Sequence, residues 1–287
     1  MTVAVLHPDA SELRFATLLR KRRETLLVNA GSFPFADDSI KLHSAGPQMV
    51  RPAEAAEVFV QAAARSGARR LVLVLPDAWM RSFVLEGEAM PHREKELRER
   101  VAWHLKKAFL LKPDEVRFAW ARLRDGAGGV GRLLVTFTLD RFLSTLDEAF
   151  DHRKLRLGAV VTSFWTLYHA LPRQGDWGLL VVEEGLWTLG AFTDGHLLSL
   201  RQRLLPPGGP GPVMDEVRRT FALGGAAPPS RLVVYQHPAV LPLEEGGLPG
   251  EVLAPALRGR VRADASRLPQ FWNPEGEIFA GGLHVVP

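Results

Sequence analysis

Residues Arg70–Asp77 read RLVLVLPD, and this stretch decides the fold. Its apolar run, Leu71–Leu75, has the length of a strand and is ended by a proline and an aspartate. A strand with one face in water alternates apolar and polar residues, whereas this run is unbroken. The pattern before it, from Pro52 to Gly67, has the apolar spacing of a helix. We therefore predict a strand that is covered on both faces, in a parallel or mixed sheet.

Outward from this strand, one order of elements occurs twice. Three strands, a helix and a strand make up the first copy, and the same order returns after residue 174. The predicted strands and helix of the first copy are Val3–His7, Leu13–Leu19, Thr25–Asn29, Pro52–Gly67 and Arg70–Leu75; those of the second are Trp177–Val182, Trp187–Phe192, Leu197–Leu204, Val213–Leu223 and Arg231–Tyr235. The sequence thus predicts an internal structural repeat.

An insertion separates the two copies. It reads as a strand, a charged amphipathic helix from His92 to about Phe109, and two further strands. The glycine-rich stretch Gly126–Gly131 joins those two strands and does not lead into a helix, so it is expected to be a hairpin turn and not a dinucleotide loop. The prediction is an α/β fold with mixed-sheet lobes at 1–174 and 175–287 and a strand-helix-strand-strand subdomain inserted at about 79–138.

Composition excludes several classes of protein. The chain has 287 residues, 46% hydrophobic and 24% charged, which suits a globular protein. It has no cysteine, so disulfides, thiolate metal sites and cysteine nucleophiles are excluded. No secretory signal opens the chain, and no window nears the roughly 18 apolar residues of a membrane helix. We therefore expect a cytoplasmic protein. The net charge is +4, and the basic residues are scattered among acidic ones, so we expect no nucleic-acid partner.

Motifs of catalysis and metal binding are missing. The nine histidines lack metal-ligand spacing, and neither a nucleophile elbow nor a P-loop occurs. The tryptophans are expected to form core or groove walls, and they are Trp79, Trp103, Trp120, Trp165, Trp177, Trp187 and Trp272. The His92–Phe109 helix is basic on balance, which leaves two interpretations open: a solvated face with ion pairs along the helix, or a docking surface for anionic lipid or an acidic partner.

The stretch from Leu71 to Asp77 is followed by Arg81, by Met90 and Pro91, by a charged helix with Trp103, and by Lys112–Val116. With the duplicated order of elements, these features resemble PilM and the cytoplasmic part of GspL, which belong to the actin, Hsp70 and sugar-kinase superfamily. The resemblance implies duplicated actin-like (ribonuclease H-like) lobes and an inserted subdomain of the kind in FtsA. It implies a cytoplasmic assembly scaffold of a type IV pilus or type II secretion machine, peripheral to the inner membrane.

The resemblance also indicates which residues would contact ATP. The family's first phosphate turn corresponds to His7–Ser11, where glycine is absent and Pro8 removes a backbone donor. Its second corresponds to Glu183–Thr188, where Glu184 adds negative charge and Trp187 adds bulk. The candidate nucleotide contacts that remain are Asp9, Ser11, Glu183, Gly185 and Thr188.

The family's third nucleotide element would follow Tyr235, where Gln236–Ala239 stands in place of a glycine pair. Gly281–Leu283 resembles the small-residue helix that closes the family's domain. Because these contacts are degraded, we expect weak or absent binding of ATP and magnesium, no turnover and no other cofactor.

The resemblance further implies a partner. In PilM-like proteins a groove between the first lobe and the inserted subdomain receives an extended cytoplasmic peptide of PilN, and other platform components assemble nearby. The residues expected near that groove are Val74, Leu75, Trp79, Arg81 and Phe83. Association with the membrane would then be indirect, through the partner.

Two alternatives stay open. One is the cytoplasmic part of a GspL-type secretion protein, which would continue into a membrane span; the present chain ends at Pro287, which favours the pilus scaffold. The other is an active ATPase or sugar-kinase-like enzyme of the same superfamily, for which Glu183 is the candidate catalytic carboxylate.

Overall fold

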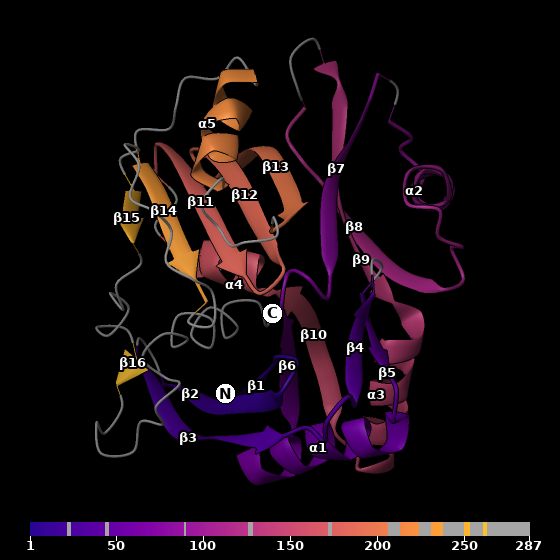
Figure 1. Ribbon diagram of the computed structural model, residues 1–287, viewed down its shortest axis with the longest axis vertical. Helices are drawn as coiled ribbons and strands as arrows, with labels where there is room; N and C mark the ends of the chain where they lie inside the picture. The colour runs from indigo at the N-terminus through magenta and orange to yellow at the C-terminus, as the bar shows by residue number, and fades with distance from the viewer. Residues whose placement is uncertain are drawn as a thin grey trace. The chain divides into compact units, whose positions relative to one another are not determined.

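The computed structural model describes residues 1–21, 24–43, 46–88, 90–125, 129–171, 174–205, 213–223, 231–237, 250–252 and 261–262. The chain forms two compact units (Figure 1). The first comprises Met1–Met80, Leu139–Leu171 and Pro255–Pro287, and the second comprises Arg81–Thr138 and Pro172–Ala254. The inserted subdomain thus falls in one unit with the second repeat; the lobe boundaries given above, which follow chain order, stay a prediction.

The first unit is built on a six-stranded sheet with the order β10-β6-β1-β2-β3-β16. Its strands are β1 (Thr2–Pro8), β2 (Glu12–Lys21), β3 (Glu24–Pro34), β6 (Arg70–Leu75), β10 (Arg156–Thr162) and β16 (Val261–Arg262). Strand β6 lies between β1 and β10 and runs parallel to both, while β1, β2 and β3 form an antiparallel meander. Every side chain from Leu71 to Leu75 is fully buried, which confirms the prediction of a doubly covered strand.

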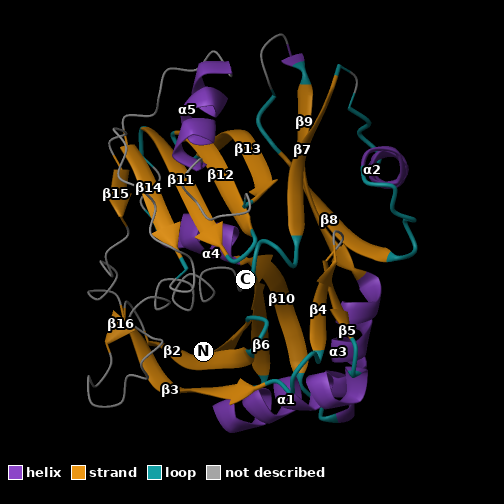
Figure 2. Cartoon of the chain, viewed as in Figure 1, coloured by secondary structure: helices purple, strands orange, loops and turns teal. Residues whose placement is uncertain are grey.

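Helices cover this sheet. They are α1 (Pro52–Ser66), α3 (Asp140–His152) and α4 (Ser163–Ala170), and a two-stranded sheet of β4 (Ile40–His43) and β5 (Gly46–Met49) precedes α1. Figure 2 shows α1 and α3 side by side, and both helices place aromatic rings in one core. Phe59 of α1 packs edge-on against Phe142 of α3, with 6.2 Å between ring centroids, and Trp79 packs on Phe142 at 5.9 Å.

The second unit contains a five-stranded sheet with the order β13-β12-β11-β14-β15. Its elements are β11 (Asp176–Glu183), β12 (Leu186–Thr193), β13 (His196–Leu204), α5 (Val213–Leu223), β14 (Arg231–Gln236) and β15 (Gly250–Val252). As in the first sheet, a meander of three strands is followed by two strands that run parallel to its first strand. The predicted repeat is therefore confirmed.

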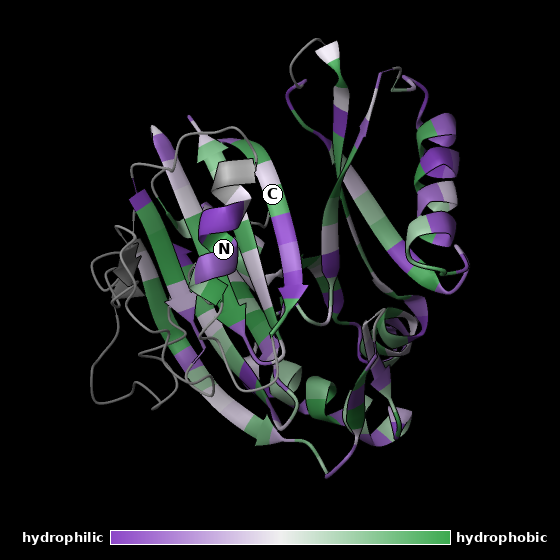
Figure 3. Cartoon of the chain, turned by 45° about the horizontal axis from the view of Figure 1, so that its top comes forward, coloured by the Kyte–Doolittle hydropathy of each residue, from purple (hydrophilic) through white to green (hydrophobic). Residues whose placement is uncertain are grey.

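The inserted segment forms a three-stranded sheet with the order β7-β9-β8 and one helix. Its elements are β7 (Arg81–Gly87), α2 (Glu94–Ala108), β8 (Val116–Arg122) and β9 (Gly131–Leu139). Helix α2 buries Leu97, Val101 and Leu105, and hydrophilic residues also occur along its length (Figure 3). The strand-helix-strand-strand prediction is confirmed, and the glycine-rich stretch joins two neighbouring strands as expected.

Helix α2 ends in an unusual way. The backbone N–H groups of Phe109 and Leu111 both donate to the carbonyl of Leu105, at 3.1 and 3.3 Å, and Leu110 between them has a φ of 57°. Leu110 directly follows the C-cap residue Phe109, and a left-handed residue at this position is usually a glycine. A side chain with a Cβ costs roughly 1–2 kcal/mol there. The leucine side chain is also 86% exposed, so burial does not offset that cost.

Polar contacts join the inserted sheet to β13. Arg132 of β9 is buried, and its guanidinium donates to the carbonyls of Leu197 and Leu198 at 3.1 and 2.5 Å and to Glu86 at 3.0 Å. Further along β13, the Gln202 side chain accepts a hydrogen bond from the backbone N–H of Ser82 on β7 at 2.8 Å. The same side chain donates to the Thr188 hydroxyl on β12 at 3.2 Å. These contacts fix β7 against the edge of the second repeat's sheet.

We predict that replacing Arg132 will destabilise the protein strongly. Arg132→Met keeps the apolar stem but leaves the buried Leu197 carbonyl and the partly buried Leu198 carbonyl without this donor, so the free energy of unfolding should fall by about 2–4 kcal/mol. Urea denaturation at neutral pH measures this loss. The matched control is Glu86→Gln, because the Glu86 side chain is 59% exposed and its ion pair should contribute less than about 1 kcal/mol. Equal free energies of unfolding for Arg132→Met and wild type would contradict this role of Arg132.

Candidate functional site

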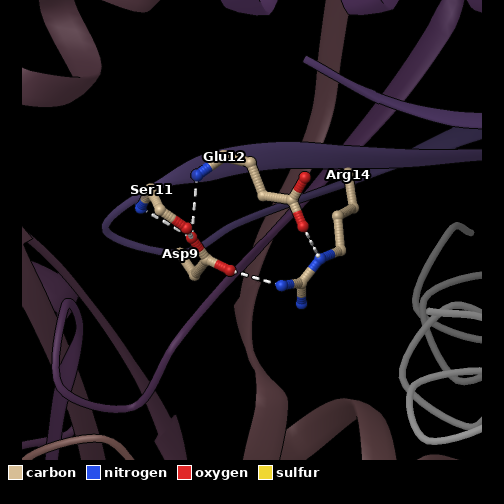
Figure 4. Close-up of polar contacts among 4 residues, drawn as sticks. All are labelled: Asp9, Ser11, Glu12 and Arg14. Atoms are coloured by element: carbon tan, nitrogen blue, oxygen red, sulfur yellow. Dashed lines mark hydrogen bonds and ion pairs between the residues drawn. The ribbon is translucent and has the colours of Figure 1, made fainter. Parts of the chain in front are cut away.

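The first predicted phosphate turn, between β1 and β2, is occupied by its own aspartate (Figure 4). The Asp9 Oδ1 atom accepts hydrogen bonds from the Ser11 N–H at 2.7 Å, the Ser11 hydroxyl at 2.8 Å and the Glu12 N–H at 2.8 Å. Its Oδ2 atom pairs with Arg14 at 2.5 Å, and Arg14 also contacts Glu12 at 2.7 Å. Both carboxylate oxygens are thus engaged within the turn, and so are the donors that a phosphate would need.

Burial alone would raise the pKa of Asp9, because it disfavours the charged form. The hydrogen bonds from Glu12 and Ser11 and the charge of Arg14 outweigh burial, so the pKa of Asp9 lies below its ordinary value. Asp9 is therefore ionised at neutral pH and holds the turn together as an internal anion. Asp9 and Ser11, the two candidate nucleotide contacts of this turn, thus contact each other.

The second predicted turn lies between β11 and β12. Gly185 has a φ of 80°, which the two-residue hairpin turn requires and which glycine adopts without strain. Glu183 and Thr188 are buried, and the Thr188 hydroxyl accepts from Gln202. The expectation that Trp187 adds bulk at this turn was wrong: Trp187 is 1% exposed and packs with Val217 of α5 in the core of the sheet.

The other predicted nucleotide elements are only partly described. Strand β14 ends at Gln236, and the N–H of His237 donates to the carbonyl of Val182 at 2.8 Å, so the chain here continues the pairing with β11. Pro238, Ala239 and Gly281–Leu283 lie outside the described residues. Within the described ranges, no group of three or more histidine or acidic side chains could hold a metal ion.

The residues predicted to line a partner groove fall into two groups. Val74 and Leu75 at the end of β6 are fully buried, and Trp79 is 4% exposed, so all three contribute to the core of the first unit. Arg81 and Phe83 lie on β7 of the second unit and are partly exposed. Because they are two residues apart on a strand, their side chains are on the same face.

Two residues that the sequence did not single out join Phe83. Its ring stacks on His104 of α2 with 4.9 Å between centroids and contacts Phe109 at 5.1 Å. Arg81 is opposite Phe137 in the β7–β9 pairing, and Phe137 also contacts Phe109, at 5.0 Å. We call Arg81, Phe83, His104 and Phe109 the β7 patch. The helical spacing of His104 from Val101 could have placed it on the apolar face of α2. The spacing could not have shown that it stacks on Phe83.

The electrostatics of the β7 patch are unusual. The Nε atom of Arg81 is buried and makes no hydrogen bond within the described part of the chain. Burial lowers the pKa of Arg81 below its ordinary value, and burial likewise lowers the pKa of His104. Buried donors are normally satisfied, and an unsatisfied one needs an explanation. The patch can offer a guanidinium to a carboxylate or carbonyl acceptor beside an apolar aromatic surface.

No protein-family model matches the sequence, and no curated protein matches it. Solved structures do match. A chain of the PilM–PilN type IV pilus biogenesis complex superposes with a TM-score of 0.70 at 16% identity, covering 100% of this chain and 99% of that one. A Bacteroides thetaiotaomicron protein with an actin-like ATPase fold and unknown function gives a TM-score of 0.55 at 11% identity, covering 100% and 96%.

The chain has an actin-like ATPase fold. The cytoplasmic domain of EpsL, an inner-membrane component of the type II secretion system of Vibrio cholerae, also matches, with a TM-score of 0.52 at 10% identity over 99% of this chain and 94% of that one. The predicted resemblance to pilus and type II secretion proteins is thus confirmed as a likeness of fold. No helix in the described ranges is both long and apolar enough to cross a membrane.

We predict that Asp9→Ala will lower the free energy of unfolding by about 2 kcal/mol at pH 7, because the turn loses three hydrogen bonds to a charged acceptor. The folded-state pKa of Asp9 is lowered, so its contribution is present above the unfolded value of about 3.9 and is lost as pH falls through the folded value. Urea titrations from pH 7 to pH 3 should therefore show the variant and wild type converging in acid.

The control for Asp9 is Asp38→Asn, since the Asp38 side chain is 78% exposed and a surface change should stay within about 0.5 kcal/mol. A wild-type urea midpoint for Asp9→Ala at pH 7 would show that the turn does not depend on this carboxylate.

A second prediction concerns His104. Its folded-state pKa is lowered, so the unfolded chain binds the proton more readily, and stability should fall as pH drops below about 6.5. His104→Phe keeps a ring on Phe83 and removes the titration, so thermal unfolding between pH 7.5 and pH 5.5 should vary less than in wild type. His104→Gln, which also removes the titrating ring, should reduce the pH dependence in the same way. A His104→Phe variant with the wild-type pH dependence would overturn the assignment.

Proposed function

We propose that this chain is a cytoplasmic scaffold of a type IV pilus assembly platform at the inner membrane, and that it binds the cytoplasmic peptide of a PilN-like membrane protein. The likeness to a chain of the PilM–PilN complex over the full length supports this role. The observation that carries peptide binding is the partly exposed Arg81, whose Nε makes no hydrogen bond among the described residues, beside the partly exposed ring of Phe83. Other platform components would bind elsewhere, and no nucleic acid is involved.

The chemistry of the β7 patch fits an extended peptide. A carboxylate or main-chain carbonyl would satisfy Arg81, and an apolar side chain two residues along the peptide would reach Phe83 and Phe109, because side chains of an extended chain alternate. The position of β7 is fixed by Gln202 and by Arg132 of the neighbouring strand, so the patch is held ready before the partner arrives.

Nucleotide turnover is not part of the proposed function. In the first turn the donors that would bind a phosphate are engaged by Asp9. In the second turn Thr188 is buried against Gln202, and Glu183 and Glu184 bring two carboxylates to the site. Repulsion between these carboxylates and a triphosphate would oppose binding. The secretion-system scaffold is the second candidate, favoured by the likeness to EpsL, and it predicts a different membrane partner.

Calorimetry with the cytoplasmic peptide of the PilN-like protein from the same organism tests the proposal. We expect a dissociation constant on the order of micromolar, as for transient contacts. Arg81→Gln should weaken binding by about tenfold or more, because the acceptor loses a charged donor, and Phe83→Ala should weaken it as well. Arg141→Gln, at an exposed position of α3, is the matched control and should bind as wild type does.

The outcomes separate the candidates. Wild-type affinity in Arg81→Gln would remove the β7 patch from the interface, and no binding of this peptide, with binding of a secretion-system peptide, would favour the EpsL-like role. A parallel titration with ATP and magnesium should give no saturable heat up to about 1 mM, which corresponds to a binding free energy weaker than about 4 kcal/mol. Release of phosphate from ATP by the pure protein would overturn the scaffold and favour the enzyme.

A further inference from the structure

The outer face of α2 near its end exposes large apolar side chains. Trp103 is 60% exposed and Leu110 is 86% exposed, whereas Leu105 on the opposite face is fully buried. Positions 103, 106 and 107 follow helical spacing, so Trp103, Lys106 and Lys107 share the face away from the core. The exposed Leu110 follows directly after the C-cap residue Phe109. We call these residues the α2 tip. The expectation that Trp103 would form a core or groove wall was wrong.

The backbone of the α2 tip indicates that Leu110 is retained for its side chain. A glycine at this left-handed position would remove the strain of the φ of 57°. A polar residue would remove the exposed apolar surface. The chain has neither a glycine nor a polar residue here. A residue in a strained backbone conformation is a reason to suspect function. Leu110 therefore carries two costs in the isolated protein, a strained backbone and an exposed apolar side chain.

The charge of the α2 tip is of one sign. From Arg100 to Pro113 the sequence has no acidic residue; Glu99 precedes this stretch, and Asp114 and Glu115 follow it, where Glu115 pairs with Lys112 at 3.0 Å. Lys107 lies over the Trp103 ring, with its ammonium 5.5 Å from the ring centroid. Lys106 is also exposed. The tip thus combines an amphipathic indole, a projecting leucine and flexible cations, a set of side chains typical of contact with a lipid interface.

We propose that the α2 tip contacts the surface of a membrane directly, through anionic lipid headgroups. Trp103 and Leu110 would enter the headgroup region while Lys106 and Lys107 pair with phosphates. A bilayer fits better than an acidic protein because the exposed face is that of a single helix, with its apolar side chains projecting outward. A protein partner would have to supply a groove around them. This inference does not rest on the peptide interface at Arg81.

The contact is weak by itself. Two apolar side chains and two lysines anchor less strongly than a single acyl chain with a polybasic segment. The tip would therefore orient a protein that a membrane partner already holds nearby, and the two attachments would reinforce each other through high effective concentration. Because headgroup attraction is screened beyond about 10 Å at 0.1 M salt, binding to vesicles should weaken as salt is added.

Co-sedimentation of the full chain with vesicles tests the proposal. Vesicles of phosphatidylcholine alone and with about one third phosphatidylglycerol are compared at low salt, and binding is expected only with the anionic lipid. Leu110→Gly should lower the partition coefficient by about tenfold, as expected when a leucine no longer leaves water. The same variant should unfold at a higher temperature than wild type, because glycine relieves the left-handed strain. Only a residue kept for binding gives both results.

Matched variants complete the test. Lys154→Gly removes one lysine at another exposed left-handed position, with a φ of 55°, and should stabilise the protein without changing vesicle binding. Leu204→Gln removes a leucine that is 71% exposed on β13 and should bind vesicles as wild type does. Substituting Lys106 and Lys107 together with glutamine should lower anionic binding by about tenfold or more. Vesicle binding that is absent in wild type, or unchanged in Leu110→Gly, would overturn the proposal.

A photo-crosslinking amino acid in place of Leu110 distinguishes the occupants in native membranes. Adducts to phospholipid would support the proposal, and adducts to a protein alone would overturn it in favour of an acidic partner. Vesicle binding by a wild-type protein that does not bind the peptide would refute the proposed function and leave this inference standing.

Discussion

The guanidinium of Arg132 is a constraint on which much of the second unit depends. A buried cation is tolerated only when its donors are satisfied, and here two main-chain carbonyls of β13 and one carboxylate satisfy them. Because those carbonyls belong to an edge strand, the inserted sheet has one favourable position against the sheet of the second repeat. The placement of β7, and through it of α2, follows from this contact. Both surfaces that we assign to binding partners therefore depend on a residue that neither partner touches.

Comparison of Arg132 with Arg81 shows how burial separates structure from function. Both side chains lose hydration, but Arg132 recovers its hydrogen bonds within the chain, whereas the Nε of Arg81 has no such recovery among the described residues. A fold optimised only for stability would avoid the second situation. Leu110 is a second residue with uncompensated costs, since its left-handed backbone and its exposed apolar side chain are both unfavourable in the isolated protein. Such local costs are expected where a surface meets something else.

The sequence predicted the regular parts of the fold because they carry strong patterns. The run at Leu71–Leu75 and the repeated order of elements were sufficient for the three-stranded meander and the next parallel strand of each sheet. Strand β10 was missed because Gly158 interrupts it and its residues are mostly half-buried, and the eight-residue α4 is too short and too uniformly buried to show a helical pattern. In the site, Asp9 beside Ser11 was recognisable as turn chemistry. The pairing of Phe83 with His104 was not, because it joins a strand to a helix through register and packing that no local pattern encodes.

The turn at Asp9 has a wider consequence for whether this loop can switch between two states. In an ATP-driven machine the bound phosphate is a removable part, and its loss resets the loop that held it. Here the corresponding negative charge is covalently part of the loop and is neutralised by Arg14, two residues after the last backbone donor. Because the Asp9 carboxylate cannot dissociate, its departure cannot reset the loop. In the scaffold that we propose, the energy for assembly would therefore come from another component.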